Sequence, residues 1–492
     1  MRAMSGSDSI FLHSEGGGIH GHSVAVLTLD PGEHDRGVVA ERIVEVLGRR
    51  AGLVPALTTQ IAEMPLGLGQ PRRFHAPDFD AARHVRLEVF LDGASRIELE
   101  KFVGEMASRP LDRTRPLWEL TLVDGLHDGS LALVAKIHHS IADGAKAVDI
   151  MLTLLDVEPG HADEPIVVPD RVIEQRPSST ALLADMVGER VRHPLGPIKA
   201  GVGLTRALGA VATAPLWAGR GRFDVRGVGA PTSPLNGTLD DTRAVAFGQV
   251  SLSSLHRARR GSGGATLNDV LLAACAGGLR RYLDERGCAT DRELVASVPI
   301  STRAPLSPGE TPAPGELSGT VNELSSMFVR LPVDRPMNMR RLRSVRNRTI
   351  NSKRFREVAG RGVAANLVEL VPPVLVEGVG PFGLAPLTRR MPPAQNLVVS
   401  NVVGPSVPMY LAGARLLSCN SFAPLPPGCG LSITAMSRDG SMDLGVMVCP
   451  SIVPDPDAVL EEVVAEMGQL AGDASAQRLG PRRSRPHRII RL

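Results

Sequence analysis

Segments with the hydrophobic pattern of β-strands alternate with segments of helical pattern in both halves of the chain. In the first half, residues 22–30 and 83–92 read as strands, and residues 37–54 carry apolar side chains at helical spacing. In the second half, residues 267–287 predict a helix and residues 294–300 a strand. A chain that interleaves strands and helices in this way is expected to fold as an α/β protein.

The length of 492 residues exceeds what one hydrophobic core usually holds, so we expect two large domains. Residues 157–178 are rich in Pro, Asp and Glu, and residues 219–240 are rich in Gly, Arg, Pro and Thr, as surface connections are. The predicted organisation is an N-terminal domain over 1–180, a linker with a helical apolar segment over 181–242, a C-terminal domain over 243–475, and a basic, disordered tail over 476–492.

Composition excludes several classes of protein. A formal net charge of +3, with Lys and Arg spread through the chain, does not favour nucleic acid as a partner. The five cysteines form no C-x-x-C pair, which argues against a disulfide framework or a thiolate zinc site and fits a reducing cytosol. The sequence starts without a signal-peptide pattern and contains no run of about 18 uncharged apolar residues. We therefore expect a cytoplasmic protein.

The segment KIHHSIADGAK, Lys136 to Lys146, places two adjacent histidines at the end of a predicted strand and an aspartate at the start of a predicted helix. Because side chains alternate across a strand, His138 and His139 must face opposite sides and differ in role. Asp143 could instead cap the helix while both histidines fill space. A metal is not expected, because catalytic zinc needs about three protein ligands and no partner cluster is found.

The residues HHSIADG resemble the HHxxxDG motif of the CoA-dependent acyltransferase superfamily, and the chain is similar to the bacterial wax ester synthase/diacylglycerol acyltransferase family. One such motif is only moderately specific, whereas several family blocks in the same order are strong. These blocks are DSIFLHSE, PDFDAARHV, PLDRTRPLWEL, LNDVLLAACAGGLRRYL, SVPISTR, MFVRLP, NLVVSNVVGP and YLAGARL. The resemblance covers nearly the whole chain.

The resemblance implies a two-domain chloramphenicol-acetyltransferase-like fold, with mixed sheets flanked by helices and a tunnel between the domains. It implies transfer of a long-chain acyl group from acyl-CoA to diacylglycerol, or to a long-chain alcohol, with acyl-CoA as co-substrate and no cofactor. His139 would be the general base, since an imidazole suits proton removal near neutral pH. His138 would pack or orient, and Asp143 would hold the site in shape by pairing with Arg303.

Two further residues are candidates for the catalytic machinery. Asn268, at the start of a predicted helix, could donate a hydrogen bond to the oxyanion of the tetrahedral intermediate, or could simply be the N-cap of that helix. Gly144, beside the base, would let backbone and ligand approach closely where a side chain would hinder them. The alternative for Gly144 is an ordinary turn glycine.

Other family blocks favour structural roles. Trp118, in the block Pro116–Trp118, reads as a core residue more readily than as a substrate contact, and Ser400 with Asn401 would shape the interface and the tunnel. Residues 340–356 carry eight Lys or Arg. Such a run is usually a solvated helix face, although the phosphates of CoA or of anionic lipid are alternative partners. Peripheral contact with a membrane or a lipid inclusion would fit lipid substrates.

The chain departs from the family pattern at three places. Val321 precedes an asparagine where the family has Gly, Phe74 stands where a Trp is common, and Arg438 replaces the tyrosine of Ser-Tyr-x-Gly. These departures concern the acceptor pocket more than the chemistry. Two rival functions are a condensation domain that forms amides and a lipid-binding paralogue without turnover. A condensation domain shares HHxxxDG, but a stand-alone chain with the PLW and SNVxGP blocks argues against it. The intact H-x-x-x-D-G argues against the inactive paralogue.

Overall fold

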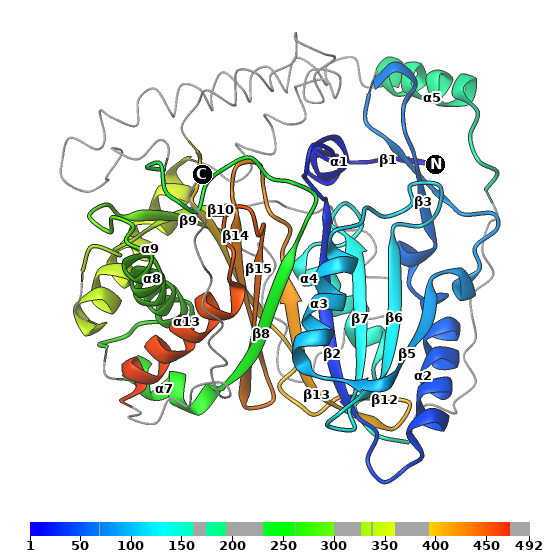
Figure 1. Ribbon diagram of the computed structural model, residues 1–492. Coiled ribbons are helices and arrows are strands. Elements are labelled where there is room, and N and C mark those ends of the chain that lie inside the picture. Colours follow the sequence, from blue (N-terminus) through cyan, green and yellow to red (C-terminus); the bar gives the residue numbers. More distant parts are fainter. Residues whose placement is uncertain are drawn as a thin grey trace, which may run out of the picture.

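The computed structural model describes residues 1–67, 69–160, 174–192, 230–260, 262–299, 326–335, 338–359 and 393–472. These residues form two six-stranded mixed sheets with helices packed against them, as the alternation of strand and helix patterns predicts (Figure 1). Several sequence features lie outside the described residues, namely Arg303, Val321, most of the apolar linker segment and the basic tail 476–492.

The first sheet belongs mainly to the N-terminal half, with strand order β12-β13-β2-β7-β6-β5. Its strands are β2 (His22–Asp30), β5 (Val85–Ala94), β6 (Trp118–Leu126), β7 (Leu131–His138), β12 (Tyr410–Leu411) and β13 (Ala414–Phe422). The helices of this half are α1 (Gly6–His13), α2 (Arg36–Ala51), α3 (Arg96–Ala107), α4 (Gly144–Leu154) and α5 (Ser179–Arg192). The strand expected at residues 22–30 is thus confirmed, and residues 37–54 lie mostly in α2.

A small three-stranded sheet accompanies the N-terminal half, with order β1-β4-β3. Its strands are β1 (Arg2–Ala3), β3 (Thr59–Ala62) and β4 (Arg72–His75), and short 3₁₀ turns lie at Pro55–Thr58, Pro65–Gly67 and Ala81–Arg83. This sheet joins the N-terminal residues to β4, and α1 follows directly after β1. The segment that precedes β2 is thereby held beside the first large sheet.

The second large sheet has strand order β10-β9-β11-β14-β15-β8. Its strands are β8 (Ala244–Ser251), β9 (Leu294–Pro299), β10 (Ser326–Leu331), β11 (Leu397–Val403), β14 (Leu431–Arg438) and β15 (Ser441–Val448), and its helices are α7 (Leu252–Arg260), α8 (Leu267–Glu285), α9 (Asn338–Ala359) and α13 (Pro456–Ala471). Figure 1 shows these helices on the side of the sheet that is turned away from the N-terminal half.

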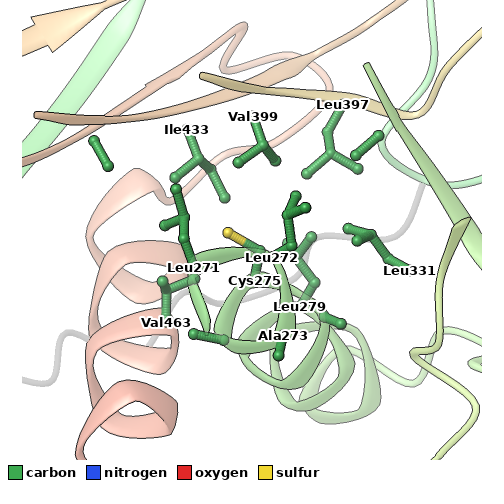
Figure 2. Packing of buried hydrophobic residues seen from close by; sticks show 14 of the residues in the cluster. Leu271, Leu272, Ala273, Cys275, Leu279, Leu331, Leu397, Val399, Ile433 and Val463 are labelled. Atoms are coloured by element: carbon green, nitrogen blue, oxygen red, sulfur yellow. The ribbon is translucent and has the colours of Figure 1, made fainter. Parts of the chain in front are cut away.

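The core of the second half lies between its sheet and α8. Figure 2 shows Leu272 and Cys275 of α8 pointing toward Leu397 and Val399 of β11, and all four side chains are buried. Helix α8 begins with the capping box of Thr266, which satisfies backbone donors at the helix start. Burial of a Leu or Val side chain stabilises a fold by roughly 1.5 to 3 kcal/mol, so this contiguous cluster supports the second half.

The second half contributes strands to the sheet of the first half. Strand β13 pairs antiparallel with β2, so residues 410–422 from the C-terminal part of the sequence complete the sheet of the N-terminal half. The division of the sequence into 1–180 and 243–475 therefore does not coincide with the division between the two sheets. Among the helices that the structure describes, none is both long and apolar enough to cross a membrane.

Candidate active site

The HHxxxDG segment forms the connection between β7 and α4. His138 is the last residue of β7, and Asp143 is the N-cap of α4, with its Oδ1 accepting a hydrogen bond from the Lys146 backbone N–H at 2.8 Å. A carboxylate suits this position, since the first N–H groups of a helix have no partner within the helix. The predicted order of strand, histidine pair and helix start is confirmed, and Asp143 does cap the helix.

His138 faces the interior, with 1% of its surface exposed. Its Nδ1 accepts a hydrogen bond from the Ser140 backbone N–H at 3.1 Å, and its Nε2 lies 3.2 Å from Oε1 of Glu15. Glu15 also accepts hydrogen bonds from the Gly21 backbone N–H and from Arg113, both at 2.8 Å. His138 is therefore locked in place, consistent with an orienting rather than a reacting side chain.

Glu15 is held as a carboxylate by its neighbours. Burial by itself would raise its pKa, but the contact with His138, together with Arg113 and the Gly21 amide, outweighs burial and holds the pKa well below its ordinary range. The carboxylate charge of Glu15 thus lies directly beside His138. It is compensated locally by Arg113, which also pairs with Glu63 at 2.5 Å.

His139 faces the opposite way and is only partly buried. Its Nδ1 lies 3.3 Å from Oγ of Ser23 on β2, and its ring meets Phe11 edge-on with 4.4 Å between ring centroids. The backbone N–H of His139 donates to the Gly21 carbonyl at 2.8 Å. Backbone and ring are therefore both fixed, which is what a base needs if it is to meet a substrate in one orientation.

The pKa of His139 is lowered from its ordinary value to about 4. Burial against protein is the largest cause, because it disfavours the charged imidazolium; Asp143 opposes the shift and His138 adds to it. The ring is therefore neutral at pH 7. A neutral imidazole can accept a proton, so the site can perform general-base chemistry at neutral pH.

Helix α1 and the residues just after it also contribute side chains to this site, and the sequence analysis did not predict them. Asp8 pairs with Arg73 at 2.9 Å, and Arg73 donates to the Ser140 carbonyl inside the HHxxxDG segment. Phe11 contacts His139, and Glu15 contacts His138. The spacing of Asp8 and Phe11 by three was the available signal, because it places both on one side of α1, whereas Glu15 lies beyond the end of that helix.

Gly144 lies where the HHxxxDG segment meets residues 400–402 of the block NLVVSNVVGP, here called the SNV block. A Cβ added at Gly144 would meet only Cγ2 of Val402, at 3.5 Å, which is an ordinary contact, and Gly144 is not among the glycines with positive φ. Protein packing therefore does not require glycine at this position. The predicted reason, close approach of a ligand, stays a prediction.

The SNV block lies on the part of β11 that is no longer paired with β9. Strand β11 pairs with β9 only at Leu397 and Val398, but with β14 along residues 398–403. Ser400 and Asn401 lie beyond the last β9 pair. No described residue donates a hydrogen bond to the buried Oδ1 of Asn401. Val402 of the block packs against the core of the N-terminal half, so β11 reaches the meeting of the two halves here. The roles of Ser400 and Asn401 in shaping the interface and the tunnel stay predictions.

Asn268 is not the N-cap of its helix. Thr266 caps α8, and Asp269 completes the capping box while its Oδ1 accepts a hydrogen bond from Thr349 of α9 at 2.6 Å. Asn268 is the second residue of α8 and is half-buried. The alternative that Asn268 caps the helix is therefore wrong, because the hydroxyl of Thr266 already fills that place. Its role as a donor to an oxyanion stays a prediction, as does the pairing of Asp143 with Arg303, which lies outside the described residues.

The block Pro116–Trp118 belongs to the core, as expected. Trp118 is 1% exposed, its ring stacks on His84 with 4.5 Å between centroids, and its Nε1–H donates to the Leu57 carbonyl at 2.6 Å. Phe74, one of the departures from the family pattern, is likewise buried, in a cluster with Leu182.

Arg438, a second departure, has a structural role. Its guanidinium pairs with Asp443 at 3.0 Å and donates to the Leu416 carbonyl at 3.2 Å, where the register of β13 against β2 shifts. Both charged side chains are buried, so each compensates the other. Within the described residues, no three His, Cys, Asp or Glu side chains gather in a way that could hold a metal ion.

Two mixed sheets, the first completed by β13 from the second half, form the two-domain chloramphenicol-acetyltransferase-like fold, with the HHxxxDG connection where the halves meet. Residues 4–271 match the wax ester synthase/diacylglycerol acyltransferase catalytic domain, and residues 320–471 match the C-terminal domain of the same family. The chain belongs to the wax ester synthase/diacylglycerol acyltransferase family, as its sequence blocks predict.

Relatives and solved structures agree with this assignment. A Mycobacterium tuberculosis H37Rv protein provisionally named diacylglycerol O-acyltransferase is 31% identical over 95% of each chain, and one from strain CDC 1551 is 29% identical over 92% of this chain and 87% of its own. The wax ester synthase/diacylglycerol acyltransferase of Marinobacter aquaeolei VT8 shares the fold, with a TM-score of 0.67, 22% identity, and coverage of 96% of this chain and all of that one. The first condensation domain of the calcium-dependent antibiotic synthetase also does, with a TM-score of 0.54, 18% identity and 97% coverage of both.

Proposed function

We propose that this protein transfers a long-chain acyl group from acyl-CoA to the hydroxyl of diacylglycerol, giving triacylglycerol and free CoA. The observation that carries the proposal is His139, which directly follows β7 in a chain of the wax ester synthase/diacylglycerol acyltransferase family. Its ring is neutral at pH 7, and both its ring and its backbone are held by hydrogen bonds. Relatives that align over nearly the whole chain carry the name diacylglycerol O-acyltransferase. Wax ester formation from a long-chain alcohol is the second activity of the same site.

His139 is the general base of the proposed reaction. Its Nδ1 is turned to the Ser23 hydroxyl, so we assign the proton transfer to Nε2. As the acceptor oxygen attacks the thioester carbonyl, Nε2 takes the hydroxyl proton, and that proton then passes to the departing thiolate of CoA. A positioned base of this kind contributes about 10² to 10⁴ in rate.

The remaining stabilisation must come from donors to the oxyanion. Asn268 is our candidate donor, since its amide is not used to cap α8, and Gly144 leaves room for the substrate beside the base. Loss of one such donor costs on the order of 10² to 10³ in turnover. Asp143 fixes the start of α4 and hence the place of His139, and Arg303 is its proposed partner.

The reaction needs acyl-CoA as co-substrate and no further cofactor, because the acceptor hydroxyl is the nucleophile and the thioester is already activated. Because the acceptor is a membrane lipid, we also propose peripheral contact with a membrane or a lipid inclusion. Amide formation, as in a condensation domain, is the runner-up, since that class shares the fold. Both family matches favour ester formation instead.

The test is an assay of the purified protein with labelled palmitoyl-CoA and either diacylglycerol or hexadecanol. Labelled triacylglycerol that is lost in His139→Ala, while the thermal unfolding of the variant stays close to wild type, would support the reaction and the base together. Labelled product from hexadecanol would rank the two acceptors. A folded wild-type protein that binds acyl-CoA but forms no ester with either acceptor would refute the proposal and favour a lipid-binding paralogue.

A further inference from the structure

Helix α9 is the most basic element that the structure describes. It spans 22 residues, and residues 340–356 carry eight Lys or Arg without one Asp or Glu. One side of the helix packs on the second half through Leu342, Val345 and Thr349, all of which are buried. The cations divide between that packed side and the outer side, so they differ in what they can do.

Two of the arginines fix the helix in place. The buried Arg341 pairs with Glu466 of α13, and Arg348 pairs with Glu293 while donating to the Arg330 carbonyl of β10 at 2.9 Å. These contacts, together with the hydrogen bond from Ser352 to a β10 carbonyl, cover the outer edge of the second sheet. The orientation of α9 is therefore set by the fold.

The outer side of α9 keeps cations that no described carboxylate approaches. Arg340, Arg343 and Arg354 are exposed on this side, and none of them lies within salt-bridge distance of a carboxylate among the described residues. We call these three residues the basic face of α9. An open depression of about 350 Å³ lies at its start, with Arg335, Ser344 and Asn347 in its lining beside Arg340, Arg343 and Arg348.

The shape and position of the basic face indicate that its binding partner is an extended anionic surface rather than a single phosphate-containing molecule. Arg340 and Arg354 are fourteen residues apart, which is roughly 21 Å along a helix. Figure 1 shows α9 in the group of helices that faces away from the N-terminal half, where His139 lies. A CoA molecule bound along this face would be directed away from the base. The charges are therefore spread over an outer surface rather than gathered around the reacting groups.

We propose that the basic face of α9 docks the protein on a membrane that contains anionic phospholipid. The inference rests on the proposed function, because an enzyme that takes diacylglycerol must reach the surface in which this lipid is dissolved. Basic residues near an anionic leaflet attract it over about a Debye length, so three exposed cations on one side of a helix complement such a surface. Arg340 and Arg343, beside the depression, are placed to contact headgroup phosphates.

The test measures sedimentation of the full chain with vesicles in the absence of acyl-CoA, so it does not depend on turnover. Vesicles of phosphatidylcholine alone are compared with vesicles that contain phosphatidylglycerol and phosphatidylcholine at a ratio of about 3 to 7. The variant Arg340→Gln/Arg343→Gln should lower partition onto the anionic vesicles about tenfold to thirtyfold. The matched control Arg86→Gln/Lys101→Gln removes the same charge from exposed positions of the N-terminal half and should change partition less than twofold.

The remaining outcomes decide against the proposal. Equal loss in both double variants would mean that net charge acts rather than this face, and wild-type protein that ignores the anionic vesicles would refute docking altogether. A further arm measures the KM for acyl-CoA with a water-soluble alcohol and no vesicles. A raised KM in Arg340→Gln/Arg343→Gln, with unchanged vesicle partition, would assign the face to CoA phosphates instead. If the acyl transfer itself fails while vesicle partition behaves as expected, the proposed function falls and the docking surface stands.

Discussion

Oγ of Ser23 lies 3.3 Å from Nδ1 of His139, and this contact joins the start of β2 to the proposed base at the end of β7. Replacing Ser23 by Ala should lower kcat about tenfold with little change in KM, because one hydrogen bond of about 1 kcal/mol helps hold the ring. Ser23→Thr keeps a hydroxyl and should recover most of the rate. If Ser23→Thr is as slow as Ser23→Ala while both unfold at the wild-type temperature, the hydroxyl does not position His139.

The lowered pKa of His139 predicts the pH at which activity falls on the acid side of the pH profile. A base acts in its unprotonated form, and burial lowers the pKa of His139 to about 4, so protonation becomes extensive only near that pH. The ratio kcat/KM, measured between pH 8 and pH 4 with brief exposures, should stay level at first and fall only as the pH nears about 4. Full recovery of activity on return to pH 7 is the control for unfolding. A midpoint near the ordinary value for histidine would contradict this account of the site.

Two variants of Asp143 separate its role as the N-cap of α4 from the effect of its charge on His139. Asn also caps helices well, so Asp143→Asn should leave stability nearly unchanged, whereas Asp143→Ala should lower the free energy of unfolding by about 1 kcal/mol. The carboxylate raises the pKa of His139 against the effect of burial, so losing its charge should lower that pKa further and move the acid limb to lower pH in both variants. Urea unfolding and pH profiles provide the two readings. Wild-type pH profiles in both variants would show that the charge does not act on His139.

The local parts of this architecture could be predicted from the sequence. His22–Asp30 forms β2, the histidine pair ends β7, and Asp143 opens α4, because hydrophobic period and capping chemistry act over a few residues. The pairing of β13 with β2 could not be predicted in the same way. Ser418 of β13 donates a hydrogen bond to Thr28 of β2 across 390 positions of the chain, and a pairing at such distance leaves no local pattern.

The candidate site was predicted unevenly for the same reason. His138, His139 and Asp143 lie within one short connection, so their relation follows from the order of strand and helix. Ser23 and Glu15 reach the histidines only through the antiparallel pairing of β2 with β7 and the turn before β2. Their side chains are ordinary in composition, and their role follows from tertiary contacts that the sequence pattern does not encode.

A substitution at Gly144 can separate the effect on folding stability from the effect on substrate binding. A Cβ at this position would meet Val402 at an ordinary 3.5 Å, so Gly144→Ala should fold with unchanged or slightly raised stability. If backbone and substrate approach each other here, the variant should still lose about tenfold or more in kcat/KM. Gly48→Ala, inside α2 and in open space, is the matched control and should raise stability by about 0.5 to 1 kcal/mol without changing activity. Full activity in Gly144→Ala would assign Gly144 to an ordinary turn.

Glu100 links the two halves and makes their contact sensitive to pH. On α3, its Oε1 accepts hydrogen bonds from Arg96 at 2.9 Å and from the backbone N–H of Phe247 on β8 at 3.2 Å. Burial raises the pKa of Glu100 to about 7, against the opposing charge of Arg96. Because this pKa is raised above the unfolded value, the folded state binds the proton more tightly, and the contribution to stability is present at low pH and lost as the pH rises through about 7.

Glu100→Gln should therefore flatten the stability difference between pH 5 and pH 8 by on the order of 2 kcal/mol, since Gln keeps a neutral acceptor at the same place. Thermal unfolding at the two pH values, in wild type and variant, measures this difference. Glu105→Gln, at an exposed position of the same helix, should keep the wild-type pH dependence. If Glu100→Gln also keeps it, the carboxyl of Glu100 is ionised throughout this range, and the contact between α3 and β8 does not respond to pH.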